Sequence, residues 1–150
     1  MVHLDKLWKR FDSIYCINLK ERTDRFRRCH AEFQKVGLST RVEFFNPVRH
    51  PSNPIQGCYE SHQHLIRQSY DRGDQWCLIF EDDISIDTDW DPRVLNDCID
   101  FLSNPTHPCE LFYLGCHIHM ADTTTQQVRD TSIYRVKALQ THAYAVSREF

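Results

Sequence analysis

The chain has 150 residues, of which 41% are hydrophobic and 26% are charged, and its formal net charge is −3. This length predicts a single domain over residues 1–150, and the acidic balance argues against a nucleic-acid-binding protein, which is usually basic. We find neither a run approaching the ~18 apolar residues of a transmembrane segment nor the apolar core of a signal peptide near the start. The seven cysteines form no CxxC pair, which favours a reducing, cytoplasmic environment.

The first half of the chain alternates short apolar runs with amphipathic stretches. It predicts a strand at 13–19, a helix from 23 or 24 to 36, a strand at 40–45, a proline-containing loop at 46–56 and a helix at 57–72. Gly37 and Gly73 each follow a predicted helix, where glycine is the usual terminating residue.

The second half begins with the most apolar run of the chain. It predicts a strand at 75–80, a helix at 91–102, a strand at 110–115, a polar turn or hairpin tip at 123–131, and strands at 132–139 and 142–146. Strands that alternate with helices predict an α/β fold with a parallel sheet.

Three adjacent carboxylates, Glu81, Asp82 and Asp83, come directly after the strand predicted at 75–80. Ligands of open α/β sheets bind at the carboxyl ends of the strands. In an extended segment Glu81 and Asp83 point to one side and Asp82 to the other. Glu81 and Asp83 are therefore candidate ligands for a hard cation such as Mn²⁺ or Mg²⁺. The alternative is a solvated acidic turn.

A second polar cluster follows the first predicted strand, from Asn18 to Arg25. Arg22 and Arg25 lie three residues apart at the start of a helix, and guanidinium groups at a helix N-terminus form an anion site. Asp24 between them is a candidate helix cap or ribose ligand. The alternative is that these arginines pair with nearby carboxylates on a solvated helix face.

Histidines and cysteines offer further candidate sites. His62 and His64 fall on opposite sides of a helix and are a poor chelate there. His117 and His119 share one side of a strand, but no cysteine or carboxylate lies at a usual zinc spacing near them. Cys58 and His62 lie four residues apart on one helix face, as a nucleophile and its base would. The alternative for Cys58 is a thiol packed in the core.

Four short segments stand out in chain order. They are IYCINLKERTDR at 14–25, Gly57-Cys58 followed by Ser61-His62, LIFEDDI at 78–84 and HAYAVS at 142–147. Their order resembles that of motifs in glycosyltransferase family 25, which contains bacterial lipooligosaccharide galactosyltransferases and collagen hydroxylysine galactosyltransferases. Gln56 stands where the family commonly has an acidic residue, and the chain stops at Phe150, before further C-terminal elements of the family.

The resemblance implies a GT-A-like fold, a Rossmann-like α/β/α sandwich with a mostly parallel central sheet, shortened at its C-terminal end. It implies a hexosyltransferase, for example of lipopolysaccharide biosynthesis, with UDP-galactose or UDP-glucose as donor and a glycan or other hydroxylated acceptor. Asp83 would bind Mn²⁺ or Mg²⁺ with help from Glu81. The implied donor ligands are Asn18, Arg22, Asp24, Arg25 and Asp82.

Members of the family are inverting enzymes, so a base must take the proton of the acceptor hydroxyl. A divalent ion would stabilise the charge on the departing diphosphate. Glu60, His62 and His117 are the candidates for the base. Two other functions stay open: a catalytically incomplete nucleotide-sugar-binding or interaction module, and a metal-dependent phosphohydrolase that uses residues 81–83.

Overall fold

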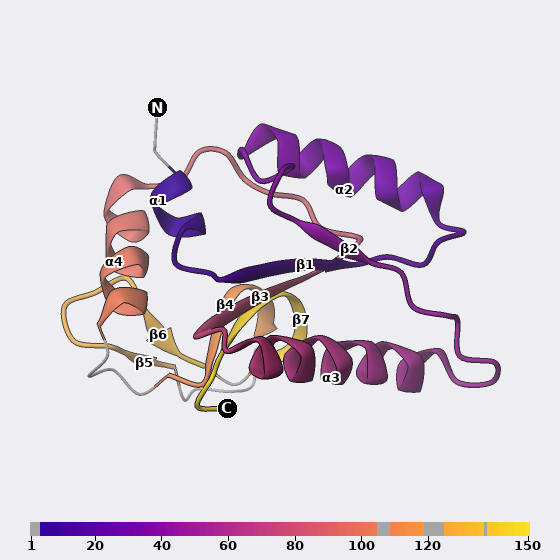
Figure 1. Ribbon diagram of the computed structural model, residues 1–150. Coiled ribbons are helices and arrows are strands. Elements are labelled where there is room, and N and C mark those ends of the chain that lie inside the picture. The colour runs from indigo at the N-terminus through magenta and orange to yellow at the C-terminus, as the bar shows by residue number, and fades with distance from the viewer. Residues whose placement is uncertain (1–3, 105–108, 119–124, 137) are drawn as a thin grey trace.

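The computed structural model describes residues 4–104, 109–118, 125–136 and 138–150. Its helices are α1 (Asp5–Trp8), α2 (Thr23–Lys35), α3 (Pro54–Arg72) and α4 (Pro92–Ser103). Its strands are β1 (Ser13–Ile17), β2 (Glu43–Phe45), β3 (Trp76–Glu81), β4 (Leu111–Ile118), β5 (Gln126–Gln127), β6 (Tyr134–Arg135) and β7 (Ala138–Ser147). Figure 1 shows a central sheet with helices on both faces, which confirms the predicted α/β class.

The main sheet has five strands in the order β2-β1-β3-β7-β4. β1 is parallel to β2 and β3, whereas β7 is antiparallel to both of its neighbours, β3 and β4. The sheet is therefore mixed, and the prediction of a mostly parallel sheet is correct for one side only. The physical reason is the connection: the described residues between β4 and β7 form the β5-β6 hairpin, not the crossover helix that a parallel neighbour needs.

The C-terminal strands differ most from the prediction. Instead of strands at 132–139 and 142–146, the structure has the two-residue β6 and the ten-residue β7. The pairing of β7 with β4 shifts register near Gly115 and again near His117, and such bulges break the alternation that a sequence pattern relies on. The predicted turn at 123–131 contains the turn at 129–130, while residues 123 and 124 lie outside the described residues.

Helix ends follow local chemistry. Gly37 and Gly73, with φ of +73° and +91°, end α2 and α3 as predicted, because glycine adopts this conformation without strain. α3 begins at Pro54, earlier than predicted. The reason is that the Asn53 side chain accepts hydrogen bonds from the N–H groups of Ile55 and Gln56, and proline suits the first helical turn.

Alternate residues of the central strands face two separate cores. On one face, Cys16, Leu78 and Phe80 pack with buried residues of α1, α2 and α4. On the other face, Tyr15 and Ile79 pack with Leu65 of α3. Figure 1 shows α2 and α3 on opposite sides of the sheet. This packing fixes α2 on one face of the sheet and α3 on the other.

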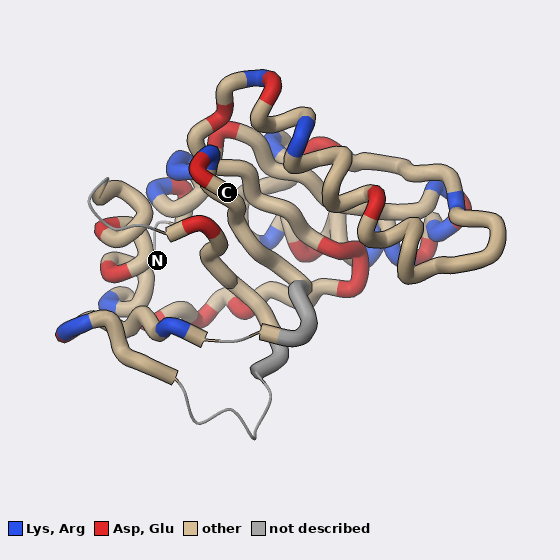
Figure 2. Tube along the Cα trace, turned by 90° about the horizontal axis from the view of Figure 1, so that it is seen from below, with Lys and Arg blue, Asp and Glu red and all other residues tan. Residues whose placement is uncertain are grey.

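Charged residues are intermingled along the chain. Figure 2 shows Lys and Arg close to Asp and Glu on many segments of the trace, an arrangement unlike the continuous basic face of many nucleic-acid-binding domains. Over the residues that the structure describes, no helix combines the length and the apolar character needed to cross a membrane.

Candidate functional site

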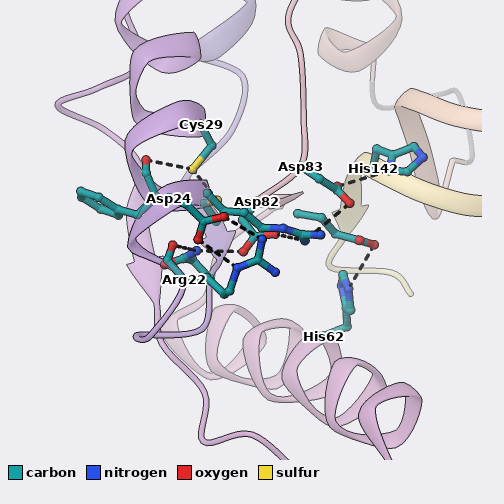
Figure 3. Close-up of polar contacts among 12 residues, drawn as sticks. Arg22, Asp24, Cys29, His62, Asp82, Asp83 and His142 are labelled. Atoms are coloured by element: carbon teal, nitrogen blue, oxygen red, sulfur yellow. Dashed lines mark hydrogen bonds and ion pairs between the residues drawn. The ribbon is translucent and has the colours of Figure 1, made fainter.

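The acidic triplet lies at the carboxyl edge of the parallel part of the sheet. β1 and β3 run side by side with Ile17 opposite Glu81, so Asn18 and Asp82 follow at the same level. β7 runs the other way, with Ala143 opposite Phe80, and His142 therefore lies at this edge as well (Figure 3). Polar residues from three strands meet at one place.

Asp82 points into the protein, where both of its carboxylate oxygens accept hydrogen bonds. Asn18 Nδ2 donates to one oxygen at 2.8 Å and Arg25 Nη1 donates to the other at 2.7 Å. Asn18 is 2% exposed and Asp82 is 7% exposed. We call Asn18, Arg25 and Asp82 the Asp82 network. It ties the loop after β1, the first turns of α2 and the end of β3 together.

Asn18 itself is held from several directions. Its backbone N–H donates to the carbonyl of Phe45 at 2.9 Å, and Asn46 Nδ2 donates to the Asn18 carbonyl at 2.8 Å. Its side-chain amide also lies 3.3 Å from the carbonyl of Arg22. Of the predicted donor ligands, Asn18 and Asp82 are thus engaged inside the protein, where they position the surrounding loops.

Arg22 and Asp24 form an exposed pair at the start of α2. Arg22 Nε and Nη2 donate to the two Asp24 oxygens at 2.9 and 2.8 Å. This contact lowers the pKa of Asp24 and raises the pKa of Arg22. Arg22 therefore follows the alternative of pairing on a solvated face, whereas Arg25 reaches the acidic triplet and lies 3.7 Å from Asp83.

Glu81 and Asp83 lie beside His142 at this edge of the sheet. His142 Nδ1 lies 3.6 Å from Asp83 Oδ1, and one ligand atom from each of Glu81, Asp83 and His142 lies within 4.8 Å of the others. Figure 3 shows Asp83 and His142 directed toward each other. We call these three residues the rim group. The alternation predicted for an extended segment does not hold, because β3 ends at Glu81 and residues 82–83 form a turn, yet Glu81 and Asp83 still lie close together.

His142 was missed as a candidate ligand by sequence reasoning. Its segment was predicted to be a strand, but a pattern of alternating residues does not reveal which strand is the neighbour or in which direction it runs. The signal that finds His142 is the antiparallel register of β7 with β3. In the sequence, His142 is 61 residues away from Glu81 and has no chelating partner at short spacing.

The electrostatics of the rim group favour a cation. The pKa of Glu81 is raised, first by burial and then by the charge of Asp83, while His142 and Arg25 oppose the shift to a smaller extent. The positive charge near Glu81 within the protein is therefore too little to offset burial and the charge of Asp83. A bound divalent ion supplies such compensation, because positive charge near a carboxylate stabilises the ionised form.

A third arrangement surrounds His62 on α3. His62 Nδ1 lies 2.7 Å from the hydroxyl of Tyr144, and His62 Nε2 lies 3.9 Å from Glu81 Oε1. Burial lowers the pKa of His62, so the ring is neutral near pH 7. Cys58 lies one helical turn before His62, and one ligand atom from each of Cys58, His62 and Glu81 also lies within 4.8 Å of the others. We call these three residues the thiol group.

Cys58 is neither a packed thiol nor an activated nucleophile. The residue is exposed, so the prediction that it packs in the core is wrong. The pKa of its thiol is raised, first by desolvation and then by Glu81 and Asp83, whereas a nucleophilic cysteine needs a lowered pKa.

The remaining candidates lie apart from this edge or outside the described residues. Glu60 is exposed and accepts a hydrogen bond from Gln56 at 2.8 Å, and it is two positions from His62, which turns it away from the face that His62 uses. His64 stacks on Phe45 with ring centroids 5.0 Å apart. The side chain of His117 lies outside the described residues, as does the whole of His119.

A scan against models of protein families finds no match to this chain, and a search of curated proteins finds none either. The resemblance to glycosyltransferase family 25 therefore stays a prediction, and function is argued below from the geometry of the site.

Proposed function

We propose that this chain is a metal-dependent, inverting glycosyltransferase with a GT-A-like fold, which transfers galactose or another hexose from a UDP-sugar to a hydroxyl of a glycan or similar acceptor. One observation carries the proposal: the rim group places two carboxylates and an imidazole together at the carboxyl edge of the sheet, beside the first turns of α2. Nucleotide-binding α/β proteins hold their ligands at this edge.

The rim group fits a divalent ion on its donor chemistry. Carboxylate oxygens suit Mg²⁺ and Mn²⁺, and an imidazole among the ligands favours Mn²⁺, since Mg²⁺ prefers an octahedron of oxygens. Glu81, Asp83 and His142 would hold the ion and leave its remaining positions to substrate oxygens. When bound, the ion supplies Lewis-acid stabilisation of the negative charge that develops on the departing diphosphate.

The start of α2 is suited to the diphosphate. The Arg22 side chain makes no capping hydrogen bond at this end of α2, and backbone N–H groups at a helix N-terminus attract phosphate. Arg22 lies on the surface with Asp24 as its partner, so it exchanges that partner for a phosphate at low cost. The Asp82 network fixes Arg25 and the loop around it, which keeps these groups in place without rearrangement.

The transfer also needs a base for the acceptor hydroxyl. Of the three candidates, His62 is the one whose described side chain faces the acidic edge, as Figure 3 shows. Its lowered pKa leaves an unprotonated ring near neutral pH, which is the form that accepts a proton. Glu60 lies on another face of α3, so the geometry ranks it lower.

Thermal unfolding tests the donor site directly. The full chain is heated with UDP-galactose, UDP-glucose or UDP, each with Mn²⁺ and with chelator. A ligand at a hundred times its dissociation constant stabilises the folded state by about 2.7 kcal/mol, or roughly 5–10 °C for a chain of this size. We expect that shift only when nucleotide and Mn²⁺ are both present.

Two variants sharpen the test. Asp83→Ala should lose the shift, while Asp71→Ala, which removes an exposed carboxylate near the far end of α3, should keep it. An equal shift in Asp83→Ala and wild type would overturn the metal assignment. Binding without sugar transfer to any acceptor would favour the non-catalytic module, and phosphate release from a simple ester would favour the phosphohydrolase.

A further inference from the structure

We propose that the thiol group, Cys58, His62 and Glu81, is a second metal site, selective for ions that prefer sulfur and nitrogen ligands, Zn²⁺ above all. The ligand atoms of these three residues lie within 4.8 Å of one another. Its ligand chemistry differs from that of the rim group. Cys58 and His62 take the places of Asp83 and His142, so a thiolate replaces one carboxylate.

The fold brings the three ligands together from two elements. Cys58 and His62 lie four residues apart in α3, so their side chains project from the same face, one turn apart. Leu65 fixes this face of α3 on the sheet by packing with Ile79 of β3. Glu81 ends the same strand, and the helix face therefore opposes it.

Gly57 sets the path of the chain just before Cys58. A Cβ at Gly57 would lie 2.8 Å from the Cβ of His50, closer than two carbons approach without a shift. Glycine thus allows the preceding loop to pass close against α3. Ser61 is buried and its hydroxyl donates to the Gly57 carbonyl at 2.7 Å. These contacts hold the first turns of α3, and with them Cys58, in a defined position.

Tyr144 orients the His62 ring as a metal ligand needs. Its hydroxyl lies 2.7 Å from His62 Nδ1, and Nε2 faces Glu81. Histidines that bind metals commonly donate their other N–H to an oxygen, which fixes the ring and its tautomer. In the tautomer protonated at Nδ1, this N–H donates to the Tyr144 hydroxyl, and the lone pair of Nε2 points to the space shared with Glu81 and Cys58.

The ligand set and its spacing match zinc. Protein sites with three ligands and one open position are a common form of zinc site, and thiolate selects Zn²⁺ over Mg²⁺ or Mn²⁺. Two nitrogen or oxygen ligands of a tetrahedral zinc ion are about 3.3 Å apart, given bonds near 2.0 Å. The observed separation of 3.9 Å between His62 Nε2 and Glu81 Oε1 closes with small side-chain rotations.

Glu81 belongs to both groups, so zinc at the thiol group removes a ligand from the rim group. Zinc should therefore weaken Mn²⁺-dependent donor binding and occupy His62. This consequence rests on the proposed function, whereas the zinc site itself does not.

A cobalt titration of the full chain tests the site without any donor. Co²⁺ takes zinc sites and gives a thiolate-to-cobalt charge-transfer band and intense visible bands when its geometry is tetrahedral. We expect both in the wild type and their loss when Zn²⁺ is added. Cys58→Ser should lose the charge-transfer band. The matched control Cys109→Ser should keep it, because Cys109 is a partly exposed cysteine just before β4 and outside the thiol group.

Cys58 is exposed, so its replacement leaves no core cavity and the variant should fold. Circular dichroism of each variant checks this. A wild-type chain without the band at saturating Co²⁺, or an equal band in Cys58→Ser, would overturn the proposal. Binding of Mn²⁺ and UDP tests the proposed function separately from the zinc site. Cys58→Ser should still bind both as the wild type does.

Discussion

The two sides of the acidic triplet behave in opposite ways although they are adjacent in the chain. Asp82 is buried, and both of its oxygens are satisfied by Asn18 and Arg25. Asp83 is exposed, and the nitrogens of Arg25 and His142 lie 3.7 and 3.6 Å from its oxygens, beyond hydrogen-bond distance. The Asp82 carboxylate is used in hydrogen bonds within the protein, and the carboxylates of Glu81 and Asp83 are available to a ligand.

This difference shows how a strand end builds a site. A buried carboxylate needs hydrogen-bond partners within the protein, and the Asp82 network provides them while it fixes the direction of the chain. The turn at 82–83 then leaves Asp83 exposed. A rigid, internally satisfied residue therefore holds its unsatisfied neighbours at a defined position, which is what a metal site requires.

The largest effect on stability is expected from Asp82→Ala. The change removes the shorter of the two hydrogen bonds of the Asn18 amide and the acceptor of Arg25 Nη1, at a cost of about 1–3 kcal/mol. Asp83→Ala should cost about 0.5 kcal/mol or less, as surface changes usually do. Urea denaturation of both variants in chelator measures the contrast. Equal losses would mean that the two sides of the triplet do not differ.

Tyr144→Phe separates the orientation of His62 from the ligands themselves. It removes the hydroxyl that contacts His62 Nδ1 and keeps the ring, which is 7% exposed. Loss of such a supporting contact typically lowers metal affinity about 10–100-fold. We expect a loss of this size for Co²⁺ at the thiol group and little change for Mn²⁺ at the rim group. A cobalt affinity like that of the wild type would show that the hydroxyl does not position the ring.

A smaller, pH-dependent effect is expected at Glu32, a second internally satisfied carboxylate. Lys35 donates to one oxygen at 2.5 Å and the backbone N–H of Ile86 donates to the other at 3.0 Å. These contacts lower the pKa of Glu32, with Lys35 as the first cause. The stabilisation is therefore present above the ordinary glutamate pKa of about 4.3 and is lost as the pH falls through the lower pKa of the folded state.

Glu32→Gln should accordingly be less stable than the wild type at neutral pH, and the gap should close in acid. Urea midpoints of both proteins at neutral pH and well below pH ~4 measure this. A gap that is constant with pH would show that the charge of Glu32 does not contribute.

Local features of the fold could be predicted from the sequence, and distant pairings could not. The ends of α2 and α3 follow from Gly37 and Gly73. The acidic triplet lies at the end of β3 as predicted, although the chain turns at 82–83 and does not stay extended. The antiparallel course of β7 is decided by the connection from β4 and by packing between distant segments. For that reason His142 and the partners of His62 were found only once the strands were placed. The inward role of Asp82 likewise depends on Asn18, 64 residues away.

The central claim is that the rim group binds a divalent ion, and electron paramagnetic resonance of Mn²⁺ tests it most directly. The signal of free Mn²⁺ is measured as wild type, Asp83→Ala or Asp71→Ala is added in turn. Wild type and Asp71→Ala should deplete the free signal, more strongly with UDP present, and Asp83→Ala should leave it close to that of buffer. Equal depletion by all three proteins, or by none, would contradict the account.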